Sequence, residues 1–175
     1  RQCKMAINVK TLREGFLRVL PLFLLIYICI SEFHTQFYYW NIFSFNFQFI
    51  LIYYWILRDP SILGYGFVFL CGMINDVVLS LPLGTSPLSY LFVSLVAAYV
   101  RNATVRSTLL TDWFTFIVAI LVGNMIAFFL IQNFTEMKVD YSTSFYNSMF
   151  TFILYPVFWS LFELYRRLIS LRTYD

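Results

Sequence analysis

The stretch from Gly64 to Gly84 holds the polar residues of this sequence that are best placed to do chemistry. Asp76 is a carboxylate inside a run of Val, Leu, Phe, Ile and Met. Spacing at multiples of four places residues on one stripe of a helix, and that spacing holds for Gly64, Gly72, Asp76 and Ser80. Small residues on such a stripe let a second helix approach closely. We therefore expect a polar cluster, used for structure or for partner binding, formed by Gly72, Asp76, Ser80 and Gly84.

Asp76 itself has two interpretations, and the sequence leaves both open. It lies about one and a half helical turns before the turn at Pro82-Leu83-Gly84, where it could clamp loop backbone or a hydroxyl such as that of Ser86 or Ser89. A carboxylate within a bilayer must face protein, water or a partner, so it could equally contact a partner or a ligand. No chain of Asp, Glu or His continues inward from it, so we do not expect a proton relay.

A second stripe of small residues occurs near the middle of a later apolar run. Ala119, Gly123 and Ala127 form a small-xxx-small repeat, which is typical of close packing between membrane helices. Asn124 lies beside this stripe, and we expect it to hydrogen-bond to a neighbouring helix. The stripe is therefore predicted to serve packing between helices of the chain, although a partner helix could use the same face.

The remaining charged residues suggest nothing catalytic. Glu163 precedes Arg166 and Arg167 by three and four positions, which predicts local ion pairs on one helix. No metalloprotease, phosphate-loop or serine-hydrolase motif is present. The single His34 and the cysteines inside apolar runs suit neither a metal site nor a disulfide framework. We predict a chain without catalytic residues, bound metal or cofactor.

The composition places these residues in a membrane. Of the 175 residues, 61% are hydrophobic and 12% are charged, whereas about a quarter of an ordinary globular chain is charged. So much apolar surface cannot be hidden in one small core, so a lipid bilayer is the expected surroundings. The basic residues lie at the edges of apolar runs and form no stripe, which argues against a nucleic-acid partner.

We predict an all-α membrane protein, a single domain folded as a bundle of six transmembrane helices. The run up to Ile30 has a basic start but no small-residue cleavage pattern after it, so we expect a retained helix rather than a signal peptide. Met5 is the expected initiator, and residues 1–4 are set aside. Tyr53, Tyr54 and Trp55 are expected at the headgroup level, as amphipathic rings prefer. The expected spans are residues 16–31, 42–57, 62–81, 87–100, 113–131 and 145–164.

The basic residues also predict the orientation. With the N-terminus inside, all of the twelve Lys and Arg residues except Lys138 fall in inner segments. An excess of Lys and Arg in short loops marks the cytoplasmic side of a membrane protein. Both termini are therefore predicted to be cytoplasmic.

Several runs, in their order and spacing, resemble the bacterial rod shape-determining protein family MreD. A Tyr-Trp pair closes the second expected helix, Gly and Asp stand four apart in the third, and a Leu-Gly turn follows. A proline, aromatic residues and a basic tail mark the last helix. The runs are Tyr53-Tyr54-Trp55-Ile56-Leu57-Arg58-Asp59-Pro60, Gly66-Phe67-Val68, Gly72-Met73-Ile74-Asn75-Asp76-Val77-Val78, Leu83-Gly84, Leu154-Tyr155-Pro156-Val157-Phe158-Trp159 and Arg166-Arg167.

This resemblance implies a function. Proteins of the MreD family belong to the cell-elongation machinery of the inner membrane, where they bind MreC and help link MreB filaments to the RodA glycosyltransferase and its class B penicillin-binding partner. They have no established catalytic activity. The resemblance thus implies a non-enzymatic scaffold of peptidoglycan synthesis that maintains rod shape.

The resemblance also supplies the main rival. MreD-like proteins are thought to share their helical arrangement with the substrate-binding subunits of energy-coupling-factor vitamin transporters. Those subunits typically carry an Ala-xxx-Ala motif on the first helix, and residues 16–30 contain no alanine. This counts against a vitamin-binding subunit, which remains the alternative function.

Overall fold

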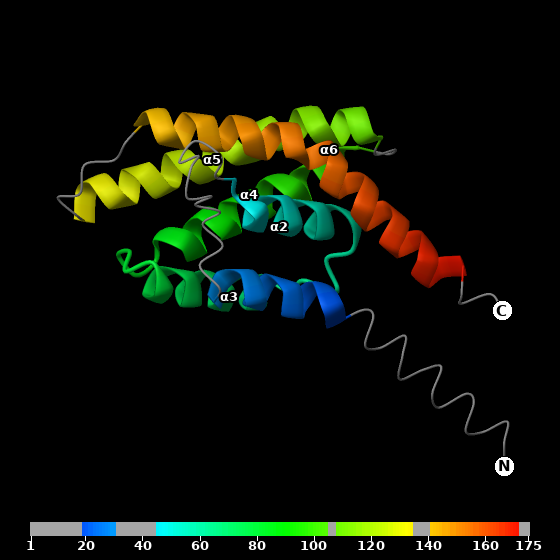
Figure 1. The fold of residues 1–175 in the computed structure, drawn as a ribbon, viewed down its shortest axis with the longest axis horizontal. Coiled ribbons are helices and arrows are strands. Elements are labelled where there is room, and N and C mark those ends of the chain that lie inside the picture. Colours follow the sequence, from blue (N-terminus) through cyan, green and yellow to red (C-terminus); the bar gives the residue numbers. More distant parts are fainter. Residues whose placement is uncertain (1–18, 31–44, 105–107, 135–140, 172–175) are drawn as a thin grey trace, which may run out of the picture.

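The computed structural model describes residues 19–30, 45–104, 108–134 and 141–171. These residues form helices and connecting turns, with no strand among them, so the all-α prediction is confirmed. Each helix runs antiparallel to the one before it (Figure 1). The helices are an N-terminal segment Val19–Ile30, α2 Phe47–Arg58, α3 Tyr65–Val78, α4 Thr85–Ala103, α5 Leu109–Phe134 and α6 Tyr141–Leu171.

The helix ends differ from the predicted spans in two ways. The third predicted span covers 62–81, but α3 is shorter because it ends at Val78 and Ser80 adopts a left-handed φ of 55°. In contrast, α4, α5 and α6 extend beyond the apolar runs at both ends. Backbone hydrogen bonding does not require apolar side chains, so Ser, Thr and Arg can continue a helix past its apolar part.

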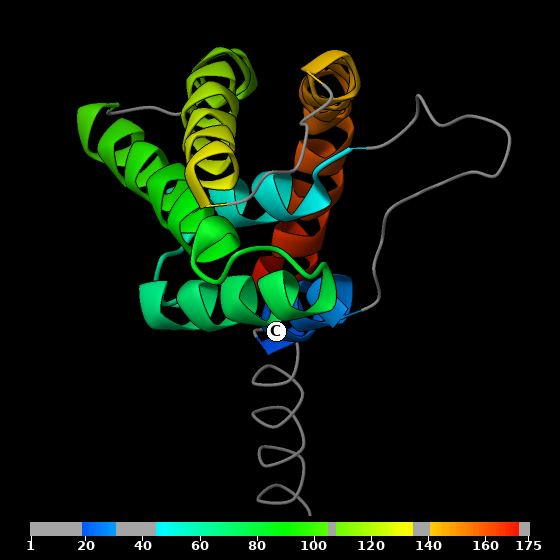
Figure 2. The ribbon, with the colours of Figure 1, turned by 90° about the vertical axis from the view of Figure 1, so that its left-hand side faces the viewer.

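The short helix α2 forms the centre of the molecule. It lies between the layer of the N-terminal segment with α3 and the layer of α5 with α6, and α4 packs along it (Figures 1 and 2). All nine residues from Phe49 to Leu57 are buried. A helix that is apolar on every face is buried on every face, and α2 is such a helix.

The aromatic cluster on α2, predicted at the headgroup level, faces protein rather than lipid. Tyr53 and Tyr54 are 0% exposed and Trp55 is 3% exposed, so these rings lie in the protein core. The Tyr53 ring packs on Phe116 of α5 and Tyr155 of α6, with centroids 5.0 and 5.9 Å away. An apolar run has the same composition whether lipid or other helices surround it, so hydropathy alone does not show that these rings face protein.

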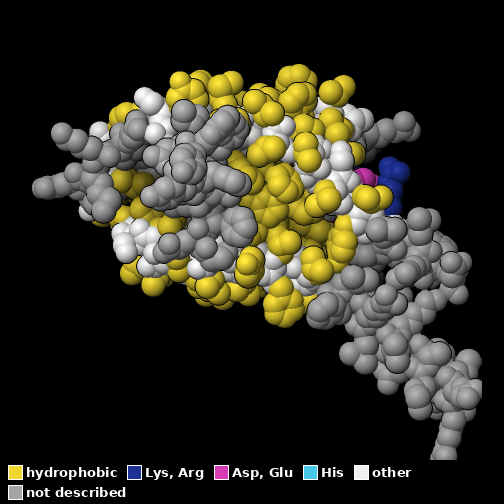
Figure 3. All heavy atoms as spheres, viewed as in Figure 1, with side chains coloured by type: hydrophobic (Ala, Val, Ile, Leu, Met, Phe, Trp, Pro, Cys, Tyr) yellow, Lys and Arg dark blue, Asp and Glu magenta, His cyan; other side chains and the backbone are white. Residues whose placement is uncertain are grey.

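The other helices turn large apolar side chains outward. Phe23, Leu70, Leu95, Met125 and Val157 are each at least 59% exposed, and apolar side chains gather over the described part of the face seen in Figure 3. Soluble monomers rarely leave such extensive apolar surface to water. This outer surface indicates contact with lipid or with other membrane proteins.

Two helices, α5 and α6, are long and apolar enough to cross a membrane. Only 22% of the most apolar stretch of α5 and 17% of that of α6 are buried, so neither is the core helix of a soluble protein. In contrast, α2 and α3 have 12 and 14 residues, or about 18 and 21 Å, against a hydrocarbon core of about 30 Å. A membrane protein is therefore indicated, while the six-span bundle stays a prediction.

The basic side chains of the described residues all lie at one end of the bundle. Arg58, Arg101 and the pair Arg166 and Arg167 stand near the C-terminal ends of α2, α4 and α6, which point the same way (Figure 1). Arg101 also donates to the carbonyl oxygen of Ile56 over 3.4 Å. This grouping is what the predicted orientation requires of these four residues.

Helix α3 approaches the start of α4 closely at Gly72. A Cβ atom at Gly72 would lie 2.6 Å from both the Cα and the N of Pro87, and so would displace backbone rather than a side chain. Gly66, on the same helix, has nothing within 4 Å of the corresponding point. Of these two glycines, only Gly72 is therefore required by packing.

We expect Gly72→Ala to lower the free energy of unfolding by about 1–3 kcal/mol, the usual cost of overpacking. Gly66→Ala is the matched control, and it should be neutral or stabilising by up to about 1 kcal/mol because alanine is the better helix former. Denaturant unfolding in detergent micelles, followed by Trp fluorescence, measures both. Equal stability of the two variants would show that α3 and α4 do not approach closely at Gly72.

Candidate functional site

Asp76 caps helix α4 from the end of the preceding helix. The carboxylate is fully buried. Its Oδ2 accepts the N–H of Gly84 over 2.7 Å, and its Oδ1 accepts the N–H of Ser86 over 2.8 Å. The first N–H groups of a helix have no partner within the helix, and Asp76 supplies the acceptors. These contacts are those of a structural clamp, one of the two interpretations of Asp76, whereas a partner contact stays a prediction.

Other polar groups complete this α3–α4 junction. Asn75 Nδ2 donates to Ser86 Oγ over 2.9 Å, and Thr85 Oγ1 donates to the carbonyl oxygen of Pro82 over 2.8 Å. Gly84 precedes α4 with a φ of +106°, a conformation that favours glycine. Gly84 of the Leu-Gly turn is therefore needed both for its left-handed backbone conformation and for the N–H that it donates to Asp76.

The predicted stripe of Gly64, Gly72, Asp76 and Ser80 is only partly formed. Gly64 precedes the first residue of α3, and a Cβ there would meet nothing within 4 Å. Ser80 is exposed and follows the end of α3, so it does not join Asp76. Only Gly72 and Asp76 lie within the helix and face α4. Multiples of four align residues only while the helix continues, and α3 ends before Ser80.

The second small-residue stripe lies where α5 meets α4 and α2. Ala119 and Gly123 are buried and Ala127 is partly buried. A Cβ at Gly123 would lie 2.9 Å from Val93 Cγ2 of α4 and 3.0 Å from Phe49 Cζ of α2. Small side chains here let three helices come together.

Two of the predicted local interactions are confirmed. Asn124 Nδ2 donates to Ser148 Oγ of α6 over 2.7 Å. Glu163 pairs with Arg166 at 3.0 Å and with Arg167 at 3.6 Å. Tyr54 also donates its hydroxyl to Glu163 over 3.2 Å, so this ion pair is joined to the central helix.

An ion pair that the sequence did not predict joins three helices. Arg58 at the end of α2 donates to Asp112 Oδ2 over 2.8 Å, and Trp159 Nε1 of α6 donates to the same oxygen over 3.2 Å. The Arg58 guanidinium also lies 5.6 Å from the centre of the Trp159 ring. Asp112 is fully buried, and a buried carboxylate needs such partners.

Asp112 was missed because a single acidic residue in the first turn of an apolar helix is ordinary. Acidic side chains are favourable there through the helix dipole alone. The only available signal was that Arg58 and Asp112 both stand at predicted inner ends of helices. Several other charged residues are predicted at the same inner ends, so that observation does not show that Arg58 pairs with Asp112.

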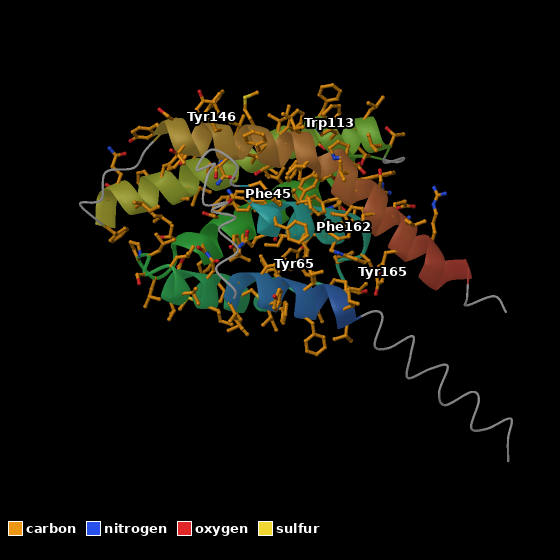
Figure 4. All side chains as sticks on the ribbon, in the orientation of Figure 1. Phe45, Tyr65, Trp113, Tyr146, Phe162 and Tyr165 are labelled. Atoms are coloured by element: carbon orange, nitrogen blue, oxygen red, sulfur yellow. The ribbon has the colours of Figure 1, made fainter. Side chains whose placement is uncertain are left out.

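Trp113, the residue after Asp112, stabilises a kink in α6. Pro156 lies inside α6 and has no N–H, so the carbonyl oxygen of Phe152 loses its helical donor. Trp113 Nε1 of α5 donates to that oxygen over 2.9 Å, and its ring stacks on Phe152 at 4.9 Å. Trp113 lies at the level where α6 bends (Figure 4). Asp112 and Trp113 therefore hold α6 on both sides of Pro156.

Tyr53 adds a further bond between α2 and α5. Its hydroxyl lies 2.7 Å from Thr115 Oγ1, which itself donates to the carbonyl oxygen of Thr111 over 2.7 Å. Since the hydroxyl hydrogen of Thr115 is used there, Tyr53 is the donor. Taken together, the polar side chains of this end connect α2, α5 and α6 to one another.

The chemistry of these two clusters is structural. Within the part of the chain that is described, no group of three or more His, Cys, Asp or Glu residues is placed to hold a metal ion. No protein-family model matches the chain, and neither a curated protein nor a solved structure is significantly similar to it. The resemblance to the MreD family therefore rests on the sequence runs themselves.

Replacing Asp76 by Asn separates the clamp from a partner contact. The amide offers one acceptor oxygen, so one of the two N–H groups of α4 loses its partner, at a cost of about 1–3 kcal/mol in unfolding free energy. The control is Asp59→Asn, a partly exposed carboxylate on the α2–α3 connection, which should change stability by less than about 0.5 kcal/mol. Unchanged stability together with lost partner co-purification would instead identify Asp76 as a partner contact.

A double-mutant cycle tests the support of the α6 kink. Trp113→Phe keeps a ring on Phe152 but removes the N–H donor, and we expect a loss of about 1–3 kcal/mol. In a Pro156→Ala background the helix can satisfy the carbonyl oxygen of Phe152 itself, so the same substitution should cost less. Unfolding free energies of the four proteins give the coupling, and strict additivity would contradict the assigned bond.

Proposed function

We propose that this chain is an MreD-like scaffold of the bacterial inner membrane, without enzymatic activity. In this proposal it binds an MreC-like protein and helps link MreB to RodA and a class B penicillin-binding protein, so that cells keep their rod shape. One observation carries the proposal: the sequence runs that resemble the MreD family meet in space, where they join helices to one another.

Two meeting points support this. Arg58, from the Tyr-Tyr-Trp run, and Trp159, from the last helix, bind the same oxygen of Asp112. At the other junction, Gly72 packs on the start of α4, and Asp76 binds the N–H of Gly84. A family that shares a packing arrangement rather than a catalytic centre would keep such residues.

The outer surface supports a role in binding. Large apolar side chains face outward from every described helix except α2, and they offer lipid-embedded contact area for the helices of a partner. The four described arginines at one end favour a cytoplasmic position for that end. The proposed scaffold would thus bind membrane partners along its helices, with both termini inside the cell.

Depletion of the protein in its host tests the proposal. We expect rod-shaped cells to become round, because cell elongation would lose a component that holds the synthase to the filaments. Affinity purification from crosslinked membranes should recover an MreC-like protein. A plasmid-borne copy of the wild-type chain should restore rod shape and is the control for the depletion itself.

The alternative function gives a different outcome in the same strain. If cells remain rod-shaped on depletion and lose uptake of one vitamin, the chain is a substrate-binding subunit of a transporter. Uptake of labelled vitamins and cell-shape microscopy on the same cultures distinguish the two functions.

A further inference from the structure

Helices α5 and α6 line an open apolar pocket of about 780 Å³. Its walls include Ile120, Leu121 and Met125 of α5 and Phe145 and Met149 of α6. Met125 is 75% exposed and Phe145 is 63% exposed, so the pocket opens on the outward apolar surface of these two helices. The two helices lie side by side in the upper layer of the bundle (Figures 1 and 2). A ligand would therefore enter from the surrounding lipid.

The pocket has a limited length because α5 and α6 touch at both of its ends. Phe128 and Tyr141 are in contact at one end, with ring centroids 5.9 Å apart, and Trp113 stacks on Phe152 at the other. From Tyr141 to Phe152 the helix rises about 16 Å. A docked helix is about 10 Å wide and would need a groove open at both ends. A single hydrocarbon chain fits a groove whose two ends are bridged by ring contacts.

One polar group is available inside the pocket. Asn124 Nδ2 donates to Ser148 Oγ over 2.7 Å, and Ser148 Oγ donates to the carbonyl oxygen of Ser144 over 2.8 Å. Because the Ser148 hydroxyl hydrogen is used in that bond, Ser148 Oγ accepts from Asn124, so the atom of Asn124 that faces it is the NH2 nitrogen. The other amide atom, Asn124 Oδ1, then has no partner among the described residues. An unpaired acceptor in hydrocarbon is costly, so a ligand with a hydroxyl or amide N–H would be favoured. Asn124, Ser144 and Ser148 all line the pocket.

We propose that this pocket binds one hydrocarbon chain of a membrane lipid that carries a hydroxyl or amide donor, with the donor bonded to Asn124 Oδ1. An apolar cavity with a few placed polar groups is the usual form of a small-molecule site. This proposal does not depend on the scaffold function, because it uses only the residues of α5 and α6.

The test uses the purified full-length chain in detergent micelles. The probe is a photoreactive, alkyne-tagged long-chain fatty alcohol, and its methyl ether serves as the version without a donor. Peptide-level mass spectrometry locates the label. We expect the alcohol to label pocket peptides of α5 and α6 saturably, and the ether to label them more weakly.

Two variants make the test specific. Ser144→Phe fills the pocket while the backbone carbonyl that Ser148 uses is kept, and it should lose most of the pocket label. Ser160→Phe is the matched control, since Ser160 is exposed on the same helix outside the pocket, and its label should match that of the wild type. Melting temperatures confirm that both variants are folded.

Three results would overturn the proposal. The first is label spread evenly over all exposed helices, and the second is label unchanged by Ser144→Phe. Both would mean ordinary lipid contact. The third is a photo-crosslink from a benzoylphenylalanine at Met125 to a co-purified polypeptide, which would make the occupant a partner helix.

Discussion

A backbone group that a turn or a proline leaves free inside this protein needs a hydrogen-bond partner, because the outer faces of the helices carry apolar side chains. Two irregularities of the fold meet this constraint through side chains. Asp76 accepts the free N–H groups at the start of α4, and Trp113 donates to the carbonyl oxygen left free by Pro156. The turn before α4 and the bend in α6 therefore depend on side chains from other elements.

The same constraint explains the ion pair at the end of α2. Arg58 ends a helix that is buried along nine consecutive residues, and its charge needs a partner close by. Asp112 meets that need and brings the start of α5 to α2, while Trp159 adds α6 to the same oxygen. Removing one partner of such a buried pair is far more costly than losing the pair of Glu163 with Arg167, whose guanidinium side chain is exposed. The junction thus sets how three helices meet.

The central position of α2 has a consequence for function. Because α2 uses all of its faces for internal contacts, binding to other molecules is left to the surrounding helices. Their outward apolar side chains suit partner helices, and the pocket between α5 and α6, which is bridged by ring contacts at both ends, suits a lipid chain. The proposed scaffold and the proposed lipid site therefore use different parts of one apolar surface.

The local features of this chain could be predicted from its sequence. The helical class, the ion pairs of Glu163 and the hydrogen bond of Asn124 to a neighbouring helix follow from composition and from spacing within one helix. The contacts of Arg58 with Asp112 and Trp159 could not be predicted, since they join residues from three helices and spacing carries no information about which helices meet. For the same reason, only the tertiary structure decided that Tyr53, Tyr54 and Trp55 face protein rather than headgroups. An apolar residue favours any surroundings without water, and packing alone determines whether those surroundings are lipid or other helices.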